Sequence, residues 1–278
     1  MNTQTIINIL INGGIEPNEA KAETEILLRH LFNFDAKKQA LGENLSTEQW
    51  QIIIEKAKTR IKTRKPIQQI TGFADFMGKK FIVNKNVLIP RDETEFLVRE
   101  AVRIINENEL KSALEIGSGS GCIACMVAYL TNCKIVGVDI SNEALYTALD
   151  NATALNLFNK AIFRKSDIYS NVRENEYFDI IISNPPYIPA SQKGFLQKEL
   201  DFEPDIALFA PDKDGISFYE KIIIDAKKHL NPKGFIAFEI GINQAELIEQ
   251  LLTENNFTNI TTIKDLANIE RVISARLN

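Results

Sequence analysis

The sequence predicts an α/β protein in which a small helical bundle precedes a mostly parallel, doubly wound sheet. Residues 1–70 carry apolar side chains at helical spacing and no strand-like alternation, whereas residues 89–278 alternate strand and helix patterns. Between these parts, the segment 71–88 alternates apolar and polar residues around Gly78, which is typical of a β-hairpin. We therefore expect an N-terminal helical domain (1–70), a β-hairpin linker (71–88) and a C-terminal α/β domain (89–278).

Helices are expected throughout the first part of the chain. Apolar residues recur at helical spacing in two segments, Ile6, Ile7, Leu10 and Ile11, then Ala22, Ile26, Leu27 and Leu31. Ser46 is placed to cap a helix that begins at Thr47, and Gln49 completes a capping box. Pro66 should end this helical part, because proline cannot continue a helix.

The strands of the second part are expected to form one sheet. They are predicted at 112–117, 134–139, 161–166, 178–183 and 234–240, with helices between them. Five successive β/α units predict a parallel sheet. Two further strands, 258–264 and 271–277, are joined without a crossover helix. We therefore expect these two to pair as an antiparallel hairpin at the sheet edge.

Local signals also predict two element boundaries. Asp92 with Glu95 forms a second capping-box pattern, so a helix should begin there and run to about residue 106. Pro232 and Gly234 should separate the helix 216–230 from the strand that follows it.

Composition and charge exclude several classes of protein. The chain has 32 Lys and Arg against 37 Asp and Glu, a formal net charge of −5, which argues against a globally basic nucleic-acid-binding protein. Residues 1–80 carry 12 basic and 9 acidic residues, whereas residues 81–278 carry 20 and 28. Three cysteines argue against a disulfide framework and favour a reducing, cytoplasmic location. No apolar stretch approaches the ~20 residues of a membrane span, so no membrane partner is expected.

A glycine-rich loop follows the first strand of the predicted sheet and consists of Gly117, Ser118, Gly119, Ser120 and Gly121. Missing side chains let a ligand approach the backbone, and the helix N-terminus behind the loop offers free N–H groups. Asp139 ends the second strand, where a ribose-binding carboxylate is expected. The loop alone favours S-adenosylmethionine (SAM) and NAD-type cofactors equally. Glu115 favours SAM, because an acidic side chain would repel a diphosphate.

The segment Asn184-Pro185-Pro186-Tyr187 directly follows the fourth strand, at the sheet edge where ligands bind in open α/β folds. Two prolines fix the backbone and remove two N–H donors, which leaves carbonyl oxygens free to accept. The Asn184 side chain and the Pro185 carbonyl can accept both N–H bonds of a planar –NH2 group, while Tyr187 contacts its plane. Such a site positions a nitrogen toward a methyl donor without a strong base.

On these residues the sequence resembles the class I SAM-dependent methyltransferases, which have a Rossmann-like sheet. More specifically, it is similar to the peptide chain release factor glutamine methyltransferases (HemK/PrmC type). The similarity rests on segments in the family's order: 66–98, EIGSGSG, VGVD, SNPPYIP, DFEPDIALFAPDKDG at 201–215, FEIG at 238–241 and ERV at 270–272. Together these segments cover essentially the whole chain.

The resemblance implies the reaction and the roles of the matching residues. The substrate would be the Gln of the Gly-Gly-Gln motif in class I release factors, methylated on its side-chain amide nitrogen, with S-adenosyl-L-homocysteine as the second product. The residues that would bind SAM are Gly117, Ser118, Gly119, Ser120, Gly121, Asp139, Asp167, Ile168 and Asn184. Asn184, Pro185, Pro186 and Tyr187 would bind the glutamine, with Asn184, Pro185 and Tyr187 serving catalysis, and no metal is implied. The helical domain would dock the release factor, and a monomer is expected.

Two site details are open within the resemblance. Arg91 and Glu93 would help to form the cofactor pocket. Family members often carry an aromatic residue directly after the Asp of the third-strand loop, whereas here Ile168 follows Asp167 and Tyr169 comes next. At this position the sequence therefore departs from the family pattern for adenine contacts.

Other classes remain as alternatives. An adenine-N6 nucleic-acid methyltransferase also uses the Asn-Pro-Pro-Tyr segment, but it must grip a phosphate backbone, and the acidic C-terminal part disfavours duplex DNA. A Rossmann-type dehydrogenase and a catalytically silent binding module are both disfavoured by the same segment.

Three further features have a structural and a functional interpretation. Cys122 and Cys125 are expected to be small core residues, because a second pair of metal ligands is missing. The basic run at 56–65 is either a solvated face or a contact with a negatively charged release factor. The long segment 191–214 is poor in regular structure and is expected to form part of the substrate wall.

Overall fold

The structure is a computed structural model that describes residues 1–278 and divides into two compact units. The smaller unit comprises Met1–Ala74, Val83–Lys85 and Gln197–Phe202. The larger unit comprises Asp75–Ile82, Asn86–Leu196 and Glu203–Asn278. Neither unit is one continuous stretch of chain, because the backbone passes from one to the other several times. None of the helices combines the length and the apolar character needed to cross a bilayer.

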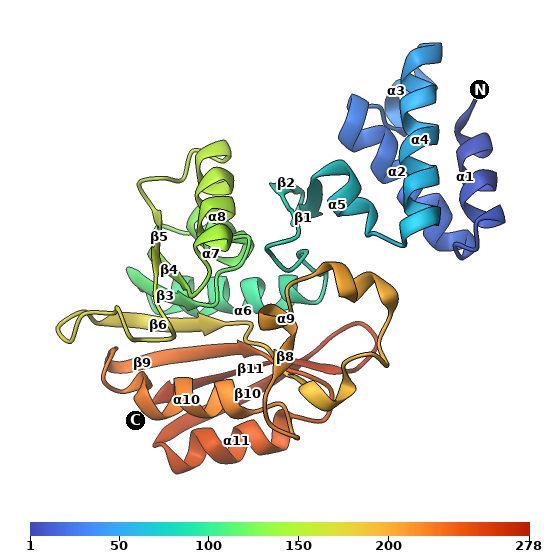
Figure 1. Cartoon of the computed structure of the whole chain (residues 1–278). Coiled ribbons are helices and arrows are strands. Elements are labelled where there is room, and N and C mark those ends of the chain that lie inside the picture. The colour runs from blue at the N-terminus through green and yellow to red at the C-terminus, as the bar shows by residue number, and fades with distance from the viewer. The chain divides into compact units, whose positions relative to one another are not determined.

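The smaller unit is built on a helical bundle, whose helices run from blue to teal in Figure 1. Its helices are α1 (Thr3–Asn12), α2 (Pro17–Phe32), α3 (Ala36–Ala40), α4 (Thr47–Thr63) and α5 (Ile67–Thr71). The core combines Ile6 and Leu10 of α1 with Leu27 of α2 and Ile53 of α4, all fully buried. The capping box predicted at Ser46 is confirmed: its side chain accepts from the Gln49 N–H, and the Gln49 side chain accepts from the Ser46 N–H.

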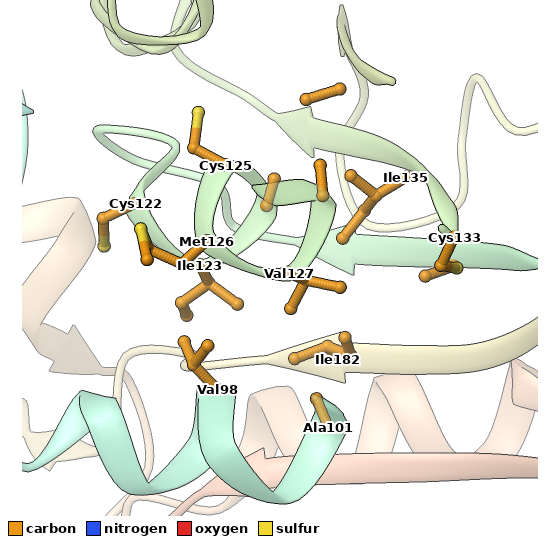
Figure 2. Close-up of a cluster of buried hydrophobic side chains, with 14 of the residues drawn as sticks. Val98, Ala101, Cys122, Ile123, Cys125, Met126, Val127, Cys133, Ile135 and Ile182 are labelled. Carbon is orange, nitrogen blue, oxygen red and sulfur yellow. The ribbon is translucent and has the colours of Figure 1, made fainter. Parts of the chain in front are cut away.

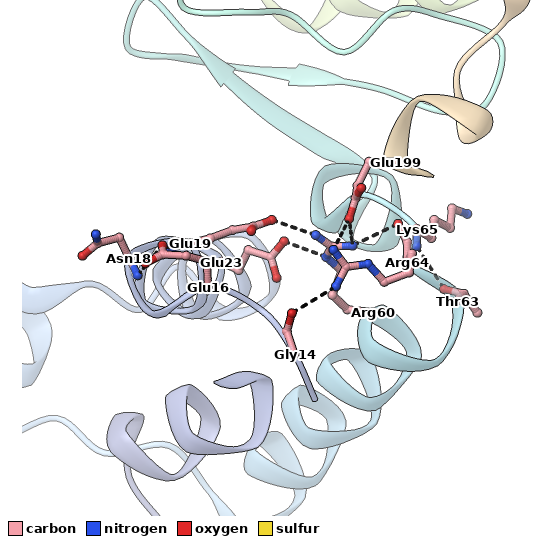
Figure 3. Close-up of polar contacts among 10 residues, drawn as sticks. All are labelled: Gly14, Glu16, Asn18, Glu19, Glu23, Arg60, Thr63, Arg64, Lys65 and Glu199. Atoms are coloured by element: carbon pink, nitrogen blue, oxygen red, sulfur yellow. Dashed lines mark hydrogen bonds and ion pairs between the residues drawn. The ribbon is translucent and has the colours of Figure 1, made fainter. Parts of the chain in front are cut away.

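Arg60 lies inside this bundle, although it belongs to the basic run at 56–65 (Figure 3). Only 1% of its side chain is exposed, and its guanidinium forms ion pairs with Glu19 at 2.8 Å, Glu23 at 2.7 Å and Glu199 at 2.8 Å. Burial raises the pKa of the Glu23 carboxyl, whereas Arg60 and Arg64 hold the pKa of Glu199 below its ordinary value despite its desolvation. For Arg60, both the solvated-face interpretation and the partner-contact interpretation are therefore wrong.

The larger unit is built on a seven-stranded sheet in the order β10-β11-β9-β6-β3-β4-β5. Its strands are β3 (Ser112–Ile116), β4 (Lys134–Asp139), β5 (Ala161–Lys165), β6 (Phe178–Ser183), β9 (Leu230–Glu239), β10 (Phe257–Lys264) and β11 (Glu270–Leu277). The first five are parallel, and β10 and β11 form an antiparallel hairpin in which β11 also pairs with β9. The predicted α/β class, with a mostly parallel sheet and an antiparallel edge hairpin, is confirmed.

Helices cover both faces of this sheet (Figure 1). One face packs against α6 (Thr94–Glu107), α7 (Cys122–Leu130) and α8 (Asn142–Ala154). The other packs against α10 (Ser217–Ala226) and α11 (Ala245–Glu254). The chain also forms two small two-stranded sheets: β1 (Phe73–Phe76) pairs with β2 (Lys79–Ile82), and β7 (Ile188–Pro189) pairs with β8 (Phe209–Ala210). Between the last two lie η1 (Ala190–Gln192), η2 (Lys198–Phe202) and α9 (Asp205–Leu208).

One predicted capping box and one predicted boundary are wrong because distant partners decide them, although α6 itself (Thr94–Glu107) agrees with the predicted helix within about two residues. No side chain caps α6; the Glu95 carboxylate instead accepts the N–H of Met77, in the β1–β2 turn, at 2.9 Å. Helix α10 ends at Ala226, and β9 begins at Leu230 and continues through the segment expected to interrupt it. The segment forms an irregularity inside β9, because the pairing jumps from Phe178–Leu230 to Ile180–Phe235, and the Asn231 amide anchors it by donating to Asp179 at 2.7 Å.

All three cysteines are buried in one apolar core cluster that also contains residues of α6, α7 and the sheet (Figure 2). Burial raises the pKa of the Cys122 and Cys133 thiols to about 12, and it raises that of Cys125 as well. Neutral, buried thiols are unreactive and pack as small apolar groups. The expectation that Cys122 and Cys125 serve the core is confirmed.

Candidate active site

A cavity of about 350 Å³ opens in the larger unit at the carboxyl ends of β3, β4 and β6. The sheet order reverses at β3, whose neighbours are β4 on one side and β6 on the other. This is the position where open α/β sheets bind ligands. The predicted site residues that line the cavity are Gly117, Ser118, Gly119, Ser120, Asp139, Asp167, Ile168, Asn184, Pro185 and Pro186. Gly121 and Tyr187 are absent from the lining.

The glycine-rich loop is held against the end of β4 by its own backbone. The Val138 carbonyl accepts from the N–H of Gly117 at 2.8 Å and from that of Ser118 at 3.0 Å. Gly121 has φ +74°, and a Cβ atom there would lie 2.8 Å from the Ala148 Cβ. Glycine is therefore required for α8 to pack this close behind the loop. Helix α7 begins at the next residue, Cys122, which lines the cavity.

Asp139 faces the cavity from the end of β4 and also orders the loops around it. Its Oδ2 accepts from the Gly119 N–H at 2.8 Å, and its Oδ1 accepts from the Ser141 N–H at 2.9 Å. Burial raises the pKa of this carboxyl, although both backbone hydrogen bonds oppose the shift. Asp139 is thus a preorganised hydrogen-bond acceptor at one wall of the cavity.

Glu115 does not face the cavity, contrary to the argument that used it to favour SAM. Its side chain is fully buried behind the glycine-rich loop, where Oε2 accepts from the Ala124 N–H of α7 at 3.2 Å. Burial raises its pKa well above the ordinary value. The negative charges of the lining come from Asp139 and Asp167 instead, and Lys221 is its sole cationic side chain.

Ile168 lies in the loop after β5 and has φ +51°, a left-handed conformation that β-branched residues rarely adopt. Hydrogen bonds hold it there: the Ser166 hydroxyl donates to the Ile168 carbonyl at 2.9 Å and accepts from the Asn171 N–H at 2.9 Å. Asp167 and Ile168 both line the cavity. Strained backbone of this kind gathers at binding sites, where the surrounding structure maintains it.

The Asn-Pro-Pro-Tyr segment leaves β6 and turns along the cavity. Asn184, Pro185 and Pro186 line it, whereas the Tyr187 ring packs behind them, against Gly241. A Cβ atom at Gly241 would lie 3.0 Å from the Tyr187 Cδ2. The Tyr187 hydroxyl is 3.4 Å from Oε1 of Glu239, and burial next to this carboxyl raises its pKa above the ordinary value.

Gln244 is a residue of this region that sequence reasoning missed. Its Nε2 donates to the Tyr187 carbonyl at 3.1 Å and to the Asp214 carbonyl at 2.8 Å, while its Oε1 accepts from the Gly241 N–H at 2.9 Å. Gly215 is part of the same contact: a Cβ atom there would lie 2.0 Å from the Tyr187 carbonyl. One amide thus ties together three loops, and no local pattern around Gln244 signals this.

Arg91 and Glu93 were expected to help form the pocket, but neither lines it; Pro90 and Thr94 do. Arg91 instead forms an ion pair with Glu203, whose other oxygen accepts from the Ile89 N–H at 2.8 Å.

The segment 191–214 contributes to the cavity wall through three residues, Pro204, Ile206 and Ala207. They lie at and next to α9, after the stretch Gln197–Phe202 that belongs to the helical unit.

Comparisons with known proteins add independent information. Residues 93–199 match the family model for the methyltransferase small domain. The chain is 37% identical over 241 residues to a release factor glutamine methyltransferase of Flavobacterium psychrophilum, covering 83% of this chain and 81% of that one. It is 34% identical over 264 residues to the enzyme of the same name from Bacteroides thetaiotaomicron, covering 93% of both. A methyltransferase from Pyrococcus furiosus has the same fold, with a TM-score of 0.52, 20% identity and coverage of 84% and 98%.

Proposed function

We infer the chemistry of the site from one premise: the chain belongs to the release factor glutamine methyltransferases. We propose that it transfers the methyl group of SAM to the side-chain amide nitrogen of the Gln in the Gly-Gly-Gln motif of class I release factors. Bound SAM would supply an electrophilic methyl group: the substrate nitrogen would bond to the methyl carbon, the carbon–sulfur bond would break with its electron pair going to sulfur, and the nitrogen would release one proton to solvent.

The observation that carries this proposal is the meeting of two segments at one cavity. Asn184, Pro185 and Pro186 line the same cavity as the glycine-rich loop and Asp139. The side-chain oxygen of Asn184 and the backbone carbonyl oxygen of Pro185 would accept hydrogen bonds from the two N–H groups of the substrate amide. This orients the nitrogen lone pair toward the methyl donor, so positioning supplies most of the rate enhancement. Tyr187 would support this segment from behind.

The cavity also suits SAM better than a dinucleotide. Its volume lies within the range of small-molecule sites. Asp139 and Asp167 give the lining a negative potential, which would repel a diphosphate and attract a sulfonium and an ammonium group. We assign Asp139 to the ribose hydroxyls and the loop 117–121 to the methionine part. Ile168 would contact the adenine through its side chain, together with Ile140 and Phe218 of the lining.

Two further assignments complete the proposal. The helical unit would dock the release factor, which its inclusion in the 93% match to the Bacteroides protein supports. A substrate that acts in translation implies a cytoplasmic enzyme. An adenine-N6 nucleic-acid methyltransferase is not favoured, because the matched relatives carry the glutamine methyltransferase name and the larger unit lacks a basic groove along its cavity.

The test uses methyl-labelled SAM and three acceptors: a class I release factor, the same factor with the Gln of its Gly-Gly-Gln motif replaced by Ala, and duplex or single-stranded DNA. We expect label on the first acceptor alone, located on the Gln by mass spectrometry of its peptide. Label on DNA and not on the Gln would overturn the proposed function.

A further inference from the structure

Glu239, the last residue of β9, lies behind the Asn-Pro-Pro-Tyr segment and is not part of the cavity lining. Its side chain is 2% exposed, and its Oε2 has no hydrogen-bond partner of good geometry. The Tyr187 hydroxyl lies 3.4 Å from Oε1 of Glu239, and this hydroxyl, the hydroxyl of Thr94 and the amide of Asn184 all lower the pKa of the carboxyl and so stabilise its charged form. A buried carboxyl with an unpaired oxygen is costly, so its retention at this place requires an explanation.

The contacts of Asn184 explain why a buried carboxyl is retained at this place. Its Nδ2 lies 3.4 Å from the hydroxyl oxygen of Thr94, the first residue of α6. An asparagine amide has a donor end and an acceptor end that point in opposite directions. With the donor end held toward Thr94 and Glu239, the acceptor end, Oδ1, turns to the cavity. The flipped amide would aim Oδ1 at a carboxylate and present an N–H donor to a substrate that itself needs acceptors.

We propose that Thr94 and Glu239 are positioning residues, which hold the Asn184 amide in the one orientation that accepts an N–H of the substrate. This inference rests on the proposed function, because the required orientation follows from an amide substrate. Thr94 connects the two residues: its hydroxyl oxygen lies 3.4 Å from the Asn184 Nδ2, and its hydroxyl lowers the pKa of Glu239. Tyr187 is held by the same carboxyl, so one buried group orders both ends of the Asn-Pro-Pro-Tyr segment.

The charge of Glu239 makes this arrangement depend on pH. The titratable and charged groups around it are Arg91 and Glu93 before α6, Cys122 of α7, Tyr187, Tyr219 of α10 and Arg271 of β11. Burial and Glu93 raise the pKa of Glu239 to about 7, against the three hydrogen bonds that lower it. The ionised carboxylate only accepts hydrogen bonds and therefore holds three donors, whereas the protonated form turns one oxygen into a competing donor.

The kinetic test compares Glu239→Gln, Thr94→Val and Thr94→Ser with the wild type. Glu239→Gln keeps the shape but cannot ionise, so we expect kcat to fall about 10- to 100-fold with SAM affinity within about twofold, as for other supporting residues behind a site. Wild-type kcat should rise as the pH rises through about 7, and this rise should be absent in Glu239→Gln. Thr94→Val should lower kcat in the same way, and Thr94→Ser should restore it.

A matched control is Glu100→Gln on α6. Glu100 is also a buried carboxyl, but it accepts from the Ser274 hydroxyl at 2.7 Å and pairs with Arg103, away from the cavity. Its variant should keep the wild-type kcat and pH profile. An unchanged kcat and pH profile in Glu239→Gln would overturn the inference.

A second measurement separates this inference from the proposed function, because it needs no substrate. In protein labelled with 15N-asparagine, the side-chain NH2 signals of Asn184, identified by their loss in Asn184→Ala, should shift with a midpoint near pH 7 in the wild type and stay constant in Glu239→Gln. If the wild type fails to methylate a release factor but this titration appears, the function is wrong and the positioning stands. If methylation occurs and the signals do not titrate, the positioning is wrong.

Discussion

Arg60 and Glu199 are separated by 139 positions in the sequence, yet their side chains form a 2.8 Å ion pair inside the helical unit. Glu199 lies in the stretch Gln197–Phe202, which comes from the chain that follows the Asn-Pro-Pro-Tyr segment. The same stretch is held a second time, because the Gln69 amide donates to the Phe202 carbonyl at 2.9 Å. The helical unit therefore depends on residues that the C-terminal half of the chain supplies.

Removing Arg60 should destabilise the helical unit strongly. Arg60→Met leaves the buried Glu23 carboxylate without its partner, and loss of one member of a buried pair costs about 3–5 kcal/mol. Urea unfolding followed by the fluorescence of Trp50, which packs in the core of this unit, measures the loss. Arg60→Lys should recover only part of it, since one ammonium cannot reach three carboxylates. A loss below about 1 kcal/mol in Arg60→Met, as expected for a surface pair, would contradict the prediction.

Asn184→Ala should abolish methyl transfer while sparing the fold. The variant removes the acceptor oxygen that we assign to the substrate amide, and loss of one preorganised hydrogen-bonding group at a reacting centre costs about 10²- to 10³-fold in kcat. Labelled methyl transfer to a release factor measures the rate, and thermal unfolding checks the fold. Transfer at more than about a tenth of the wild-type rate would exclude the assigned role.

Asp139→Ala should weaken SAM binding more than Asp139→Asn. The alanine variant loses the acceptor for the ribose and also the acceptors of the Gly119 and Ser141 N–H groups. We expect a 10- to 100-fold increase in Kd for Asp139→Ala, roughly the value of one or two charged hydrogen bonds. Isothermal titration calorimetry with SAM measures it, with NADH as a ligand that should not bind. Tight NADH binding by the wild type would contradict the SAM assignment and favour the Rossmann-type dehydrogenase.

Gly215→Ala should lower activity, whereas Gly78→Ala should not. Both glycines have φ +72°, so both variants carry the same strain, roughly 1 kcal/mol. Only at Gly215 does the added Cβ meet an atom, the Tyr187 carbonyl at 2.0 Å, and it also approaches the Gln244 Nε2 at 2.6 Å. The Asn-Pro-Pro-Tyr segment must then shift, and kcat should fall about 10-fold or more. Equal kcat values in the two variants would show that this contact does not position the segment.

The buried Glu239 should make folding less stable as the pH rises. Its pKa in the folded protein, about 7, exceeds the ordinary 4.5, so the folded state holds a proton that the unfolded state releases between these values. Its stability contribution is therefore complete below pH 4.5 and lost as the pH rises through 7. Glu239→Gln should gain on the order of 3 kcal/mol relative to the wild type between pH 5 and pH 8. Denaturant unfolding at both pH values measures this gain, and parallel pH dependence of the two proteins would refute it.

Most of the fold could be predicted because periodicity is local. The strand predicted at 178–183 has the observed bounds of β6, and the other strands of the sheet agree within a few residues at each end. The incorrect predictions concern side chains that form hydrogen bonds or ion pairs with residues distant in the sequence. Glu95 accepts the Met77 N–H and does not cap the helix, and Arg60 is buried in ion pairs with three carboxylates and is not exposed to solvent. No spacing in the sequence encodes such partners.

The grouping of the candidate site residues at one cavity could be predicted for the same reason. The carboxyl ends of parallel strands meet at one edge, so Asp139 and Asn184 could be brought together from strand positions alone. Residues whose contacts are with distant loops and side chains could not be predicted from the sequence. Gln244, Thr94 and Glu239 contact loops and side chains distant in the sequence, and their own neighbours in the sequence do not reveal these contacts.

The crossing of the chain between the two units limits how this protein can be divided. Phe202 belongs to the helical unit and Glu203 to the larger one, so a single peptide bond separates a residue of each. A fragment that starts at residue 89 would keep Glu199 but lose Arg60, and a fragment that ends at residue 70 would keep Arg60 but lose Glu199. Neither unit can therefore be excised or lost in one deletion without breaking a buried ion pair.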